Sequence, residues 1–205
     1  MERLAARVIV MSKAPVAGQV KTRLAPLLGM DGAAQLYREM LDNTLGKLQK
    51  LDGCNIELCC TPNARHTFFQ ACSARFGVNL TEQRGTDLGE RMSNAIARAL
   101  QQAECVVLIG ADCPGLETVD IETALQQLDA GTDVVLGPAT DGGYYLVAVQ
   151  ANHACLFESV VWGSAQVLAQ TLDNINRQGL SAYMLPTRSD IDRPADYLAW
   201  QQAMR

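Results

Sequence analysis

The chain has 205 residues, of which 48% are hydrophobic and 19% are charged, so it is long enough for one buried α/β core and too apolar to be disordered. No apolar stretch reaches membrane-spanning length and the N-terminus lacks a signal-peptide core, so we expect a cytoplasmic protein without a membrane span. Residues 1–205 show no repeat or linker and are predicted to form a single domain.

The net charge of −5 is unevenly distributed along the chain. Five basic residues and no acid lie between Arg3 and Met30, whereas ten acids and no Lys or Arg lie between Ala99 and Asn176. The acidic half argues against a nucleic-acid partner. A basic loop facing carboxylates suits a polyphosphate held between cations and a metal ion. The alternative is that most of these acids lie on solvated helix faces.

Seven cysteines occur without any Cys-x-x-Cys pair. Their odd number and their apolar neighbours argue against a zinc site or a disulfide framework. They predict reduced and mostly buried thiols.

The first predicted strand covers residues 7–12 and is followed by a loop, residues 13–24, that concentrates positive charge. Its notable residues are Lys13, Pro15, Gly18, Lys21 and Arg23. A loop after the first strand of an α/β sheet is a common phosphate site, and an arginine can bind two phosphate oxygens at once. The spacing of a P-loop is absent. We favour phosphate binding over a merely solvated basic loop.

Periodicity predicts a helix that is capped by Asp31 and ends near residue 50, then a strand at 56–60, a helix at 64–75 and a strand at 78–81. Gly85 and Gly89 then bracket Asp87. Glycines let the backbone approach a flat ligand closely. Asp87 is equally well explained as the N-cap of a helix that ends near residue 103.

Residues 106–109 form a continuous apolar run, as expected for a strand buried on both faces. Asp112 lies just past the carboxyl end of this strand, and Pro114 stops further pairing. Ligands of open α/β sheets gather at the carboxyl ends of strands. Asp112 is therefore a candidate metal or substrate ligand, with a turn or helix cap as the alternative.

A helix at 119–128 and a strand at 133–138 precede a turn formed by Asp141, Gly142 and Gly143. A strand at 144–149 follows. A hairpin turn alone explains this pattern. Two glycines followed by Tyr144 at the ligand end of the sheet also suit a platform for a substrate.

Trp162, a core residue or a pocket wall, precedes a helix that is capped by Ser164 and ends near residue 179. A strand at 182–185 and a short C-terminal helix complete the predicted elements. Asp190 and Asp192 alternate along an extended segment, so their side chains point the same way. With Asp112 they make an oxygen-rich set that suits Mg²⁺ bound to a phosphate, although Asp192 could simply cap the last helix.

Four motifs taken together resemble a known family; they lie at residues 13–24, 110–114, 137–145 and 190–192. The family is that of the uncharacterised, DUF2064-type nucleotide-diphospho-sugar transferase-like proteins with the GT-A fold. The resemblance covers nearly the whole chain. More distantly, the loop is similar to that of 2-phospho-lactate guanylyltransferase, and the Asp-x-Pro at Asp112 is similar to molybdenum-cofactor guanylyltransferases.

The resemblance implies a three-layer α/β/α Rossmann-like sandwich with a mixed, mostly parallel sheet that binds a nucleotide over its N-terminal half. By the guanylyltransferase pattern, Asp112, Asp190 and Asp192 would hold Mg²⁺ or Mn²⁺. The residues implied for the nucleotide are Lys13, Gly18, Lys21 and Arg23 near the phosphates, and Asp87, Gly89 and Arg91 near the nucleoside. Those implied for the second substrate are Asp141, Gly142, Gly143 and Tyr144, with Trp162 as a candidate wall.

The sequence departs from two standard patterns of this fold. Pro114 replaces the last acid of the Asp-x-Asp motif of glycosyltransferases, and the glycine-rich loop of sugar-1-phosphate nucleotidyltransferases is replaced by a cationic one. The cationic loop favours a triphosphate. We expect nucleotidyl transfer from an NTP to a small phosphorylated acceptor, with release of pyrophosphate and with Lys13, Lys21, Arg23 and Asp112 as catalytic residues. A glycosyltransferase that uses a nucleotide-diphospho-sugar and a non-catalytic nucleotide-binding protein are the alternatives.

Overall fold

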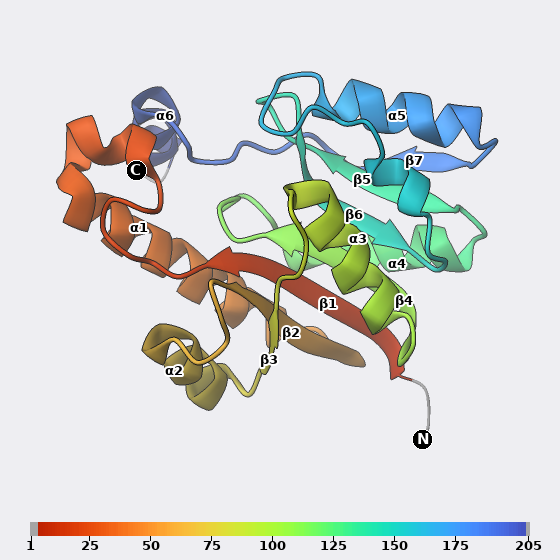
Figure 1. Ribbon diagram of the computed structural model, residues 1–205, viewed down its shortest axis with the longest axis horizontal. Helices are drawn as coiled ribbons and strands as arrows, with labels where there is room; N and C mark the ends of the chain where they lie inside the picture. Colours follow the sequence, from red (N-terminus) through yellow and green to blue (C-terminus); the bar gives the residue numbers. More distant parts are fainter. Residues whose placement is uncertain (1–3, 204–205) are drawn as a thin grey trace.

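The computed structural model describes residues 4–203, so Arg3 of the basic segment lies outside the described residues (Figure 1). One sheet contains seven strands in the order β3-β2-β1-β4-β6-β5-β7. The strands are β1 (Leu4–Lys13), β2 (Cys54–Thr61), β3 (Asn79–Glu82), β4 (Ala103–Gly110), β5 (Val134–Pro138), β6 (Tyr144–Val149) and β7 (Ala182–Met184). The helices are α1 (Ala25–Leu48), α2 (Thr67–Phe76), α3 (Leu88–Ala99), α4 (Thr118–Asp129), α5 (Val167–Arg177) and α6 (Pro194–Ala203), with 3₁₀ turns η1 (Thr22–Leu24) and η2 (Ala154–Phe157).

The sheet is mixed and mostly parallel, as expected. Strand β6 runs antiparallel to both of its neighbours, β4 and β5, and the other paired strands are parallel. A short hairpin joins β5 to β6, whereas parallel neighbours need a crossover connection. Because β5 and β4 are both antiparallel to β6, β5 runs in the same direction as β4 and β1. The loop of the hairpin therefore lies at the same edge of the sheet as the carboxyl ends of β1 and β4.

Helices cover both faces of the sheet, which makes the expected three layers (Figure 1). Along β1, Val8 and Val10 belong to a core shared with α1, α2 and α4, whereas Ile9 between them belongs to a core shared with α3 and α5. Because alternate side chains of a strand point to opposite faces, a strand buried on both sides must be apolar throughout. Five of the seven cysteines are buried, and all seven are free thiols.

Several predicted helix boundaries are wrong. Helix α1 spans Ala25–Leu48 but is broken at Gly29 (φ 71°), so a short segment with a proline in its first turn precedes the longer segment, which starts close to the predicted Asp31. Helix α3 ends at Ala99 because the chain already enters β4 at Ala103. Helix α5 begins at Val167, and the Ser164 hydroxyl bonds to the Val161 carbonyl instead of capping it. No helix within residues 4–203 is long and apolar enough to cross a membrane.

Arg7 does not contribute to the basic loop, because it lies in an ion cluster within the sheet. Its guanidinium donates to the Glu57 carboxylate over 3.3 Å, and the Glu57 side chain is fully buried. Arg98 donates to both oxygens of the same carboxylate, and the Thr81 hydroxyl donates to one of them. Burial alone would raise the pKa of Glu57, but these hydrogen bonds and the two positive charges hold it below its usual value.

Replacing Glu57 by Gln is expected to lower the free energy of unfolding by about 3 kcal/mol, because Arg7 would remain buried without a countercharge. Since the pKa of Glu57 is lower in the folded state, its contribution is complete above the unfolded-state pKa and is lost as the pH falls through the folded-state pKa. Urea unfolding across acidic pH measures both effects. Glu104→Gln, at an exposed position of β4, is the matched control, and an equal stability of the two variants would contradict the assignment.

Candidate functional site

Three loops at the carboxyl edge of β4 are joined by backbone hydrogen bonds. The Ile191 amide donates to the Asp112 carbonyl over 3.1 Å. The Thr140 amide donates to the Arg188 carbonyl over 3.0 Å, and the Arg188 amide donates to the Pro138 carbonyl over 3.0 Å. Residues 186–193 therefore run between the loop after β4 and the β5–β6 hairpin. This arrangement brings carboxylates from distant parts of the sequence together.

Two basic side chains fix these loops from outside the site. The Arg188 guanidinium donates to both oxygens of buried Asp120 in α4, over 2.8 and 3.1 Å. The Lys47 ammonium, at the end of α1, donates to the carbonyls of Pro114 and Leu116 over 2.9 and 2.8 Å. Sequence reasoning missed both, since each contact joins residues more than sixty positions apart.

The Lys21 ammonium links the basic loop, residues 13–24, to these carboxylates. It lies 3.0 Å from the Asp112 carboxylate and 3.5 Å from that of Asp192, with only 5% of its side chain exposed. Burial alone would lower the pKa of Lys21, but the neighbouring carboxylates raise it, so the ammonium stays charged. Lys21 adopts the left-handed conformation (φ 46°), which is strained for a residue other than glycine.

The other residues of the basic loop differ in their contacts. Arg23 forms an ion pair with Asp192 and remains 60% exposed. Lys13 is exposed, and no other described residue forms a hydrogen bond or ion pair with its side chain. Gly18 has a positive φ of 75°, and a Cβ there would lie 3.3 Å from the Met30 sulfur. In this loop, the side chains of Lys13 and Arg23 are therefore exposed to solvent, whereas that of Lys21 is buried against the carboxylates.

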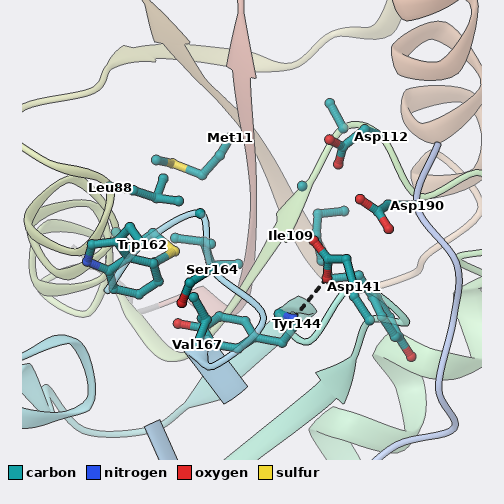
Figure 2. A pocket seen from close by; sticks show the side chains of 18 of the residues that line it. Met11, Leu88, Ile109, Asp112, Asp141, Tyr144, Trp162, Ser164, Val167 and Asp190 are labelled. Atoms are coloured by element: carbon teal, nitrogen blue, oxygen red, sulfur yellow. Dashed lines mark hydrogen bonds between the residues drawn. The ribbon is translucent and has the colours of Figure 1, made fainter. Parts of the chain in front are cut away.

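A cavity of about 320 Å³ opens beside Asp112, between α3, the ends of β1 and β4, β6 and the start of α5. Figure 2 shows that its two ends differ in chemistry. The acidic end is formed by Asp112, Asp141 and Asp190. The apolar end is formed by Met11, Leu88, Met92, Trp162 and Val167, and the Tyr144 ring lies on the same side.

The acidic end concentrates negative charge. Burial, together with the neighbouring charges of Asp141 and Asp112, raises the pKa of Asp190 to about 6. Asp192 does not line the cavity, because its carboxylate faces Lys21 and Arg23. Among the described residues, no three His, Cys, Asp or Glu side chains are arranged to hold a metal ion as they stand. Asp112 and Asp190 nevertheless offer the oxygen ligands that Mg²⁺ and Mn²⁺ prefer, at a place where a cation would relieve repulsion.

The residues of the β5–β6 hairpin are held in place by hydrogen bonds and by a close approach to the segment before α5. The Gly143 amide donates to the Asp141 carboxylate over 2.8 Å. Gly142 has a φ of 90°, and a Cβ there would lie 2.2 Å from the Ala165 carbonyl oxygen, so no side chain fits. Its own carbonyl accepts from the Leu168 amide over 2.9 Å, which ties the hairpin to α5. Gly142 therefore shapes the cavity without lining it.

The residues expected near a nucleoside have structural contacts. The Asp87 carboxylate caps α3 by accepting from the Glu90 amide over 2.8 Å, which confirms the capping interpretation. The Arg91 guanidinium donates to the Gly85 carbonyl over 3.1 Å. Gly89 lies against the Trp162 ring, and a Cβ there would approach the indole nitrogen to 2.6 Å. None of these three residues lines the cavity.

The apolar end was missed at the sequence level except for Trp162. Leu88 and Met92 lie one turn apart on α3, and Met11 is at the end of β1. Leu88 is 44% exposed although it is large and apolar. Apolar residues in regular elements are usually core residues, so their pattern alone does not mark a cavity.

Comparisons with known proteins show the family and the fold of the chain. Residues 44–164, more than half of the chain, match the family described as uncharacterized protein conserved in bacteria (DUF2064). The chain belongs to this family. A crystal structure of a proposed nucleotide-diphospho-sugar transferase from Desulfovibrio desulfuricans G20 is 31% identical, with 98% of this chain and 87% of that one covered and a TM-score of 0.90. No curated protein matches the sequence significantly.

Two more distant structures share the fold. CMP:2-keto-3-deoxy-manno-octonic acid synthetase complexed with CTP is 14% identical, with 98% of each chain covered and a TM-score of 0.62. Glucosyl-3-phosphoglycerate synthase from Mycobacterium tuberculosis, in complex with Mn²⁺, UDP and glucosyl-3-phosphoglycerate, is 13% identical, with 96% of this chain and 75% of that one covered and a TM-score of 0.55. The fold of this DUF2064 protein is thus common to nucleotidyl- and glycosyltransferases.

Gly89→Ala is expected to displace the Trp162 indole, because the new methyl group would overlap the ring. In a Trp200→Phe background, Trp162 is the only tryptophan, so its emission spectrum reports the displacement. Gly46→Ala is the matched control, since nothing lies within 4 Å of a Cβ at that helical position. An unchanged Trp162 spectrum in Gly89→Ala would contradict the described packing.

Proposed function

We propose that this protein is a divalent-metal-dependent nucleotidyltransferase that transfers a nucleotidyl group from an NTP to a small phosphorylated acceptor. The observation that carries the proposal is that the basic loop and a set of carboxylates meet at the carboxyl edge of the sheet. Lys21 of the loop forms ion pairs with Asp112 and Asp192 there. The fold is shared with a CTP-bound synthetase and with a transferase bound to UDP and Mn²⁺, which supports a nucleotide ligand.

The exposed cations of the basic loop favour a triphosphate. Lys13 and Arg23 face solvent within the same loop, so both are available to phosphate oxygens. An NTP carries about two more negative charges than the diphosphate of a nucleotide-diphospho-sugar, because it has a third phosphate and that terminal phosphate is nearly doubly ionised. It needs correspondingly more positive charge to bind. The planar guanidinium of Arg23 suits two-point contact with a phosphate.

Mg²⁺ or Mn²⁺ fits the carboxylates at this edge. Asp112 and Asp190 would hold the ion, and it would supply charge neutralisation for the phosphates. Asp192 is available as a third ligand only when its ion pairs with Lys21 and Arg23 are opened. Lys21, already next to Asp112, would then be free to contact a phosphate.

Transfer requires an acceptor oxygen to attack the α-phosphorus of the NTP while the bond to the leaving pyrophosphate breaks. A phosphate oxygen of the acceptor is already an anion, so no general base is needed. The contribution of the protein is positioning and compensation of charge by Lys13, Lys21 and Arg23.

Asp112→Asn is expected to lower pyrophosphate release by about 10²–10³-fold, the usual effect of removing one group that stabilises the transition state electrostatically. The Asp112 side chain is 40% exposed and buried Lys21 keeps Asp192 as a countercharge, so the variant should still fold. Pyrophosphate release is measured with each NTP, Mg²⁺ and a set of phosphorylated acceptors. Asp173→Asn, at an exposed position of α5, is the control, and equal rates in the two variants would contradict the role of Asp112.

Glycosyl transfer from a nucleotide-diphospho-sugar is the second candidate. It is favoured by the similarity to the Desulfovibrio desulfuricans protein, whose name describes this activity. Asp141 lines the cavity and could accept a proton from a hydroxyl acceptor in such a reaction.

The released product distinguishes the two candidates. We expect calorimetric titration to detect Mg²⁺-dependent binding of one NTP, and turnover of that NTP to release pyrophosphate. Binding of a nucleotide-diphospho-sugar with release of the nucleoside diphosphate would instead establish glycosyl transfer. Lys21→Met should weaken binding of the nucleotide in either case, because a phosphate contact and a link between two carboxylates are lost together.

A further inference from the structure

We infer that the acceptor of this enzyme is an amphiphilic small molecule, with an apolar aromatic or branched aliphatic body and one short anionic arm. The inference rests on the proposed function, in which the nucleotide phosphates lie at the basic loop and the cavity holds the second substrate. The apolar end of the cavity would take the body, and the acidic end, with its metal ion, would take the arm.

The walls of the apolar end carry no charge. Met11, Leu88, Met92 and Val167 present only aliphatic or thioether surface, and the Trp162 ring completes the end. Figure 2 shows Met11, Leu88 and Trp162 grouped on one side of the cavity, opposite Asp112 and Asp190. Apolar side chains around a preformed cavity favour an apolar ligand, because binding removes the apolar surface of the ligand and that of the cavity wall from water.

Hydrogen-bonding groups at this end are largely satisfied or inaccessible. The Ser164 hydroxyl donates to the Val161 carbonyl over 2.7 Å and accepts from the Gln166 amide over 3.3 Å. The Tyr144 hydroxyl is buried away from solvent. A sugar ring would leave most of its hydroxyl groups unpaired here, and a nucleobase would leave its polar edge unpaired, which costs affinity in both cases.

Exposure of Leu88 points to the same occupant. Leu88 is the first residue of α3, lies at the rim of the cavity and is 44% exposed, because no described element covers it. The cavity volume of about 320 Å³ lies near the lower limit of small-molecule sites, so it fits a single ring or a short branched chain. Gly89 keeps the Trp162 ring against α3, which preserves this space.

Two probes of matched charge test the inference: phenyl phosphate and glucose 1-phosphate, each titrated with Mg²⁺ present. In a Trp200→Phe background, the fluorescence of Trp162 reports occupancy of the apolar end. We expect phenyl phosphate to change the emission and to bind about tenfold more tightly than glucose 1-phosphate, as burial of one phenyl group would give. Equal affinities, tighter binding of glucose 1-phosphate, or no binding of either probe would overturn the inference.

Matched variants connect the preference to the cavity. Leu88→Asn should weaken binding of phenyl phosphate by about five- to tenfold and leave glucose 1-phosphate unaffected. Val119→Asn is the control, because Val119 is also an exposed aliphatic residue in the first turn of a helix, α4, and does not line the cavity. If both variants bind phenyl phosphate with the same affinity, the apolar end is not the site of the ring.

Titration of the unaltered protein with each NTP and Mg²⁺ separates this inference from the proposed function. NTP binding without a preference for phenyl phosphate would refute the amphiphilic acceptor and leave nucleotidyl transfer standing. A preference for phenyl phosphate that depends on Leu88, without binding of any NTP, would support the apolar acceptor site and refute nucleotidyl transfer.

Discussion

The contact between the Lys21 ammonium and the carboxylates of Asp112 and Asp192 is the interaction on which the arrangement of the site depends. It joins the loop after β1, the loop after β4 and the segment after β7 through one buried cation. Lys21 has a left-handed backbone, which costs about 1–3 kcal/mol for a side chain of this type. Two carboxylates within 3.5 Å attract the ammonium and raise the pKa of Lys21 against the effect of burial. Without this cation, the carboxylates would repel one another across the site.

The sheet topology explains why the cavity lies where it does. Strand β6 enters the sheet antiparallel between β4 and β5, so the β5–β6 hairpin lies at the edge where the parallel strands end. A turn rather than a helix connects β5 to β6, and the start of α5, α3 and Tyr37 of α1 border the cavity at this edge. Gly142 lets the hairpin approach Ala165 closely, which fixes one wall. The loop after β4 and the hairpin supply Asp112 and Asp141 of the acidic end, and α3 and the segment before α5 supply most of the apolar end.

Local pattern was sufficient for most strands, and the rule that loops meet at the carboxyl ends of strands was sufficient to bring Asp112 and Asp190 together, whereas the three layers were implied by the family resemblance. Asp192, predicted with these two carboxylates, faces Lys21 and Arg23 instead. The sequence was insufficient where the environment of a residue depends on contacts with distant parts of the chain. Arg7, counted with the basic segment, is in the core because Glu57 lies on the neighbouring strand. The short segment of α1 before Gly29 was not predicted, and the break at Gly29 separates it from the longer segment that was predicted from Asp31. Leu88 and Met92 have the period of an ordinary core helix, so only the packed structure reveals that they line a cavity.

The charges of the site also explain how nucleotide and metal binding would depend on each other in the proposed function. Arg23 pairs with Asp192 in the structure but remains 60% exposed, so an incoming phosphate competes with Asp192 for the guanidinium. A phosphate that takes Arg23 leaves Asp192 with less positive charge beside it. A divalent cation can then replace the lost charge, and it would be held more strongly by Asp112 and Asp190 when Asp192 joins them. Binding of the phosphates would therefore strengthen binding of the metal, and linkage requires the reverse to hold by the same factor.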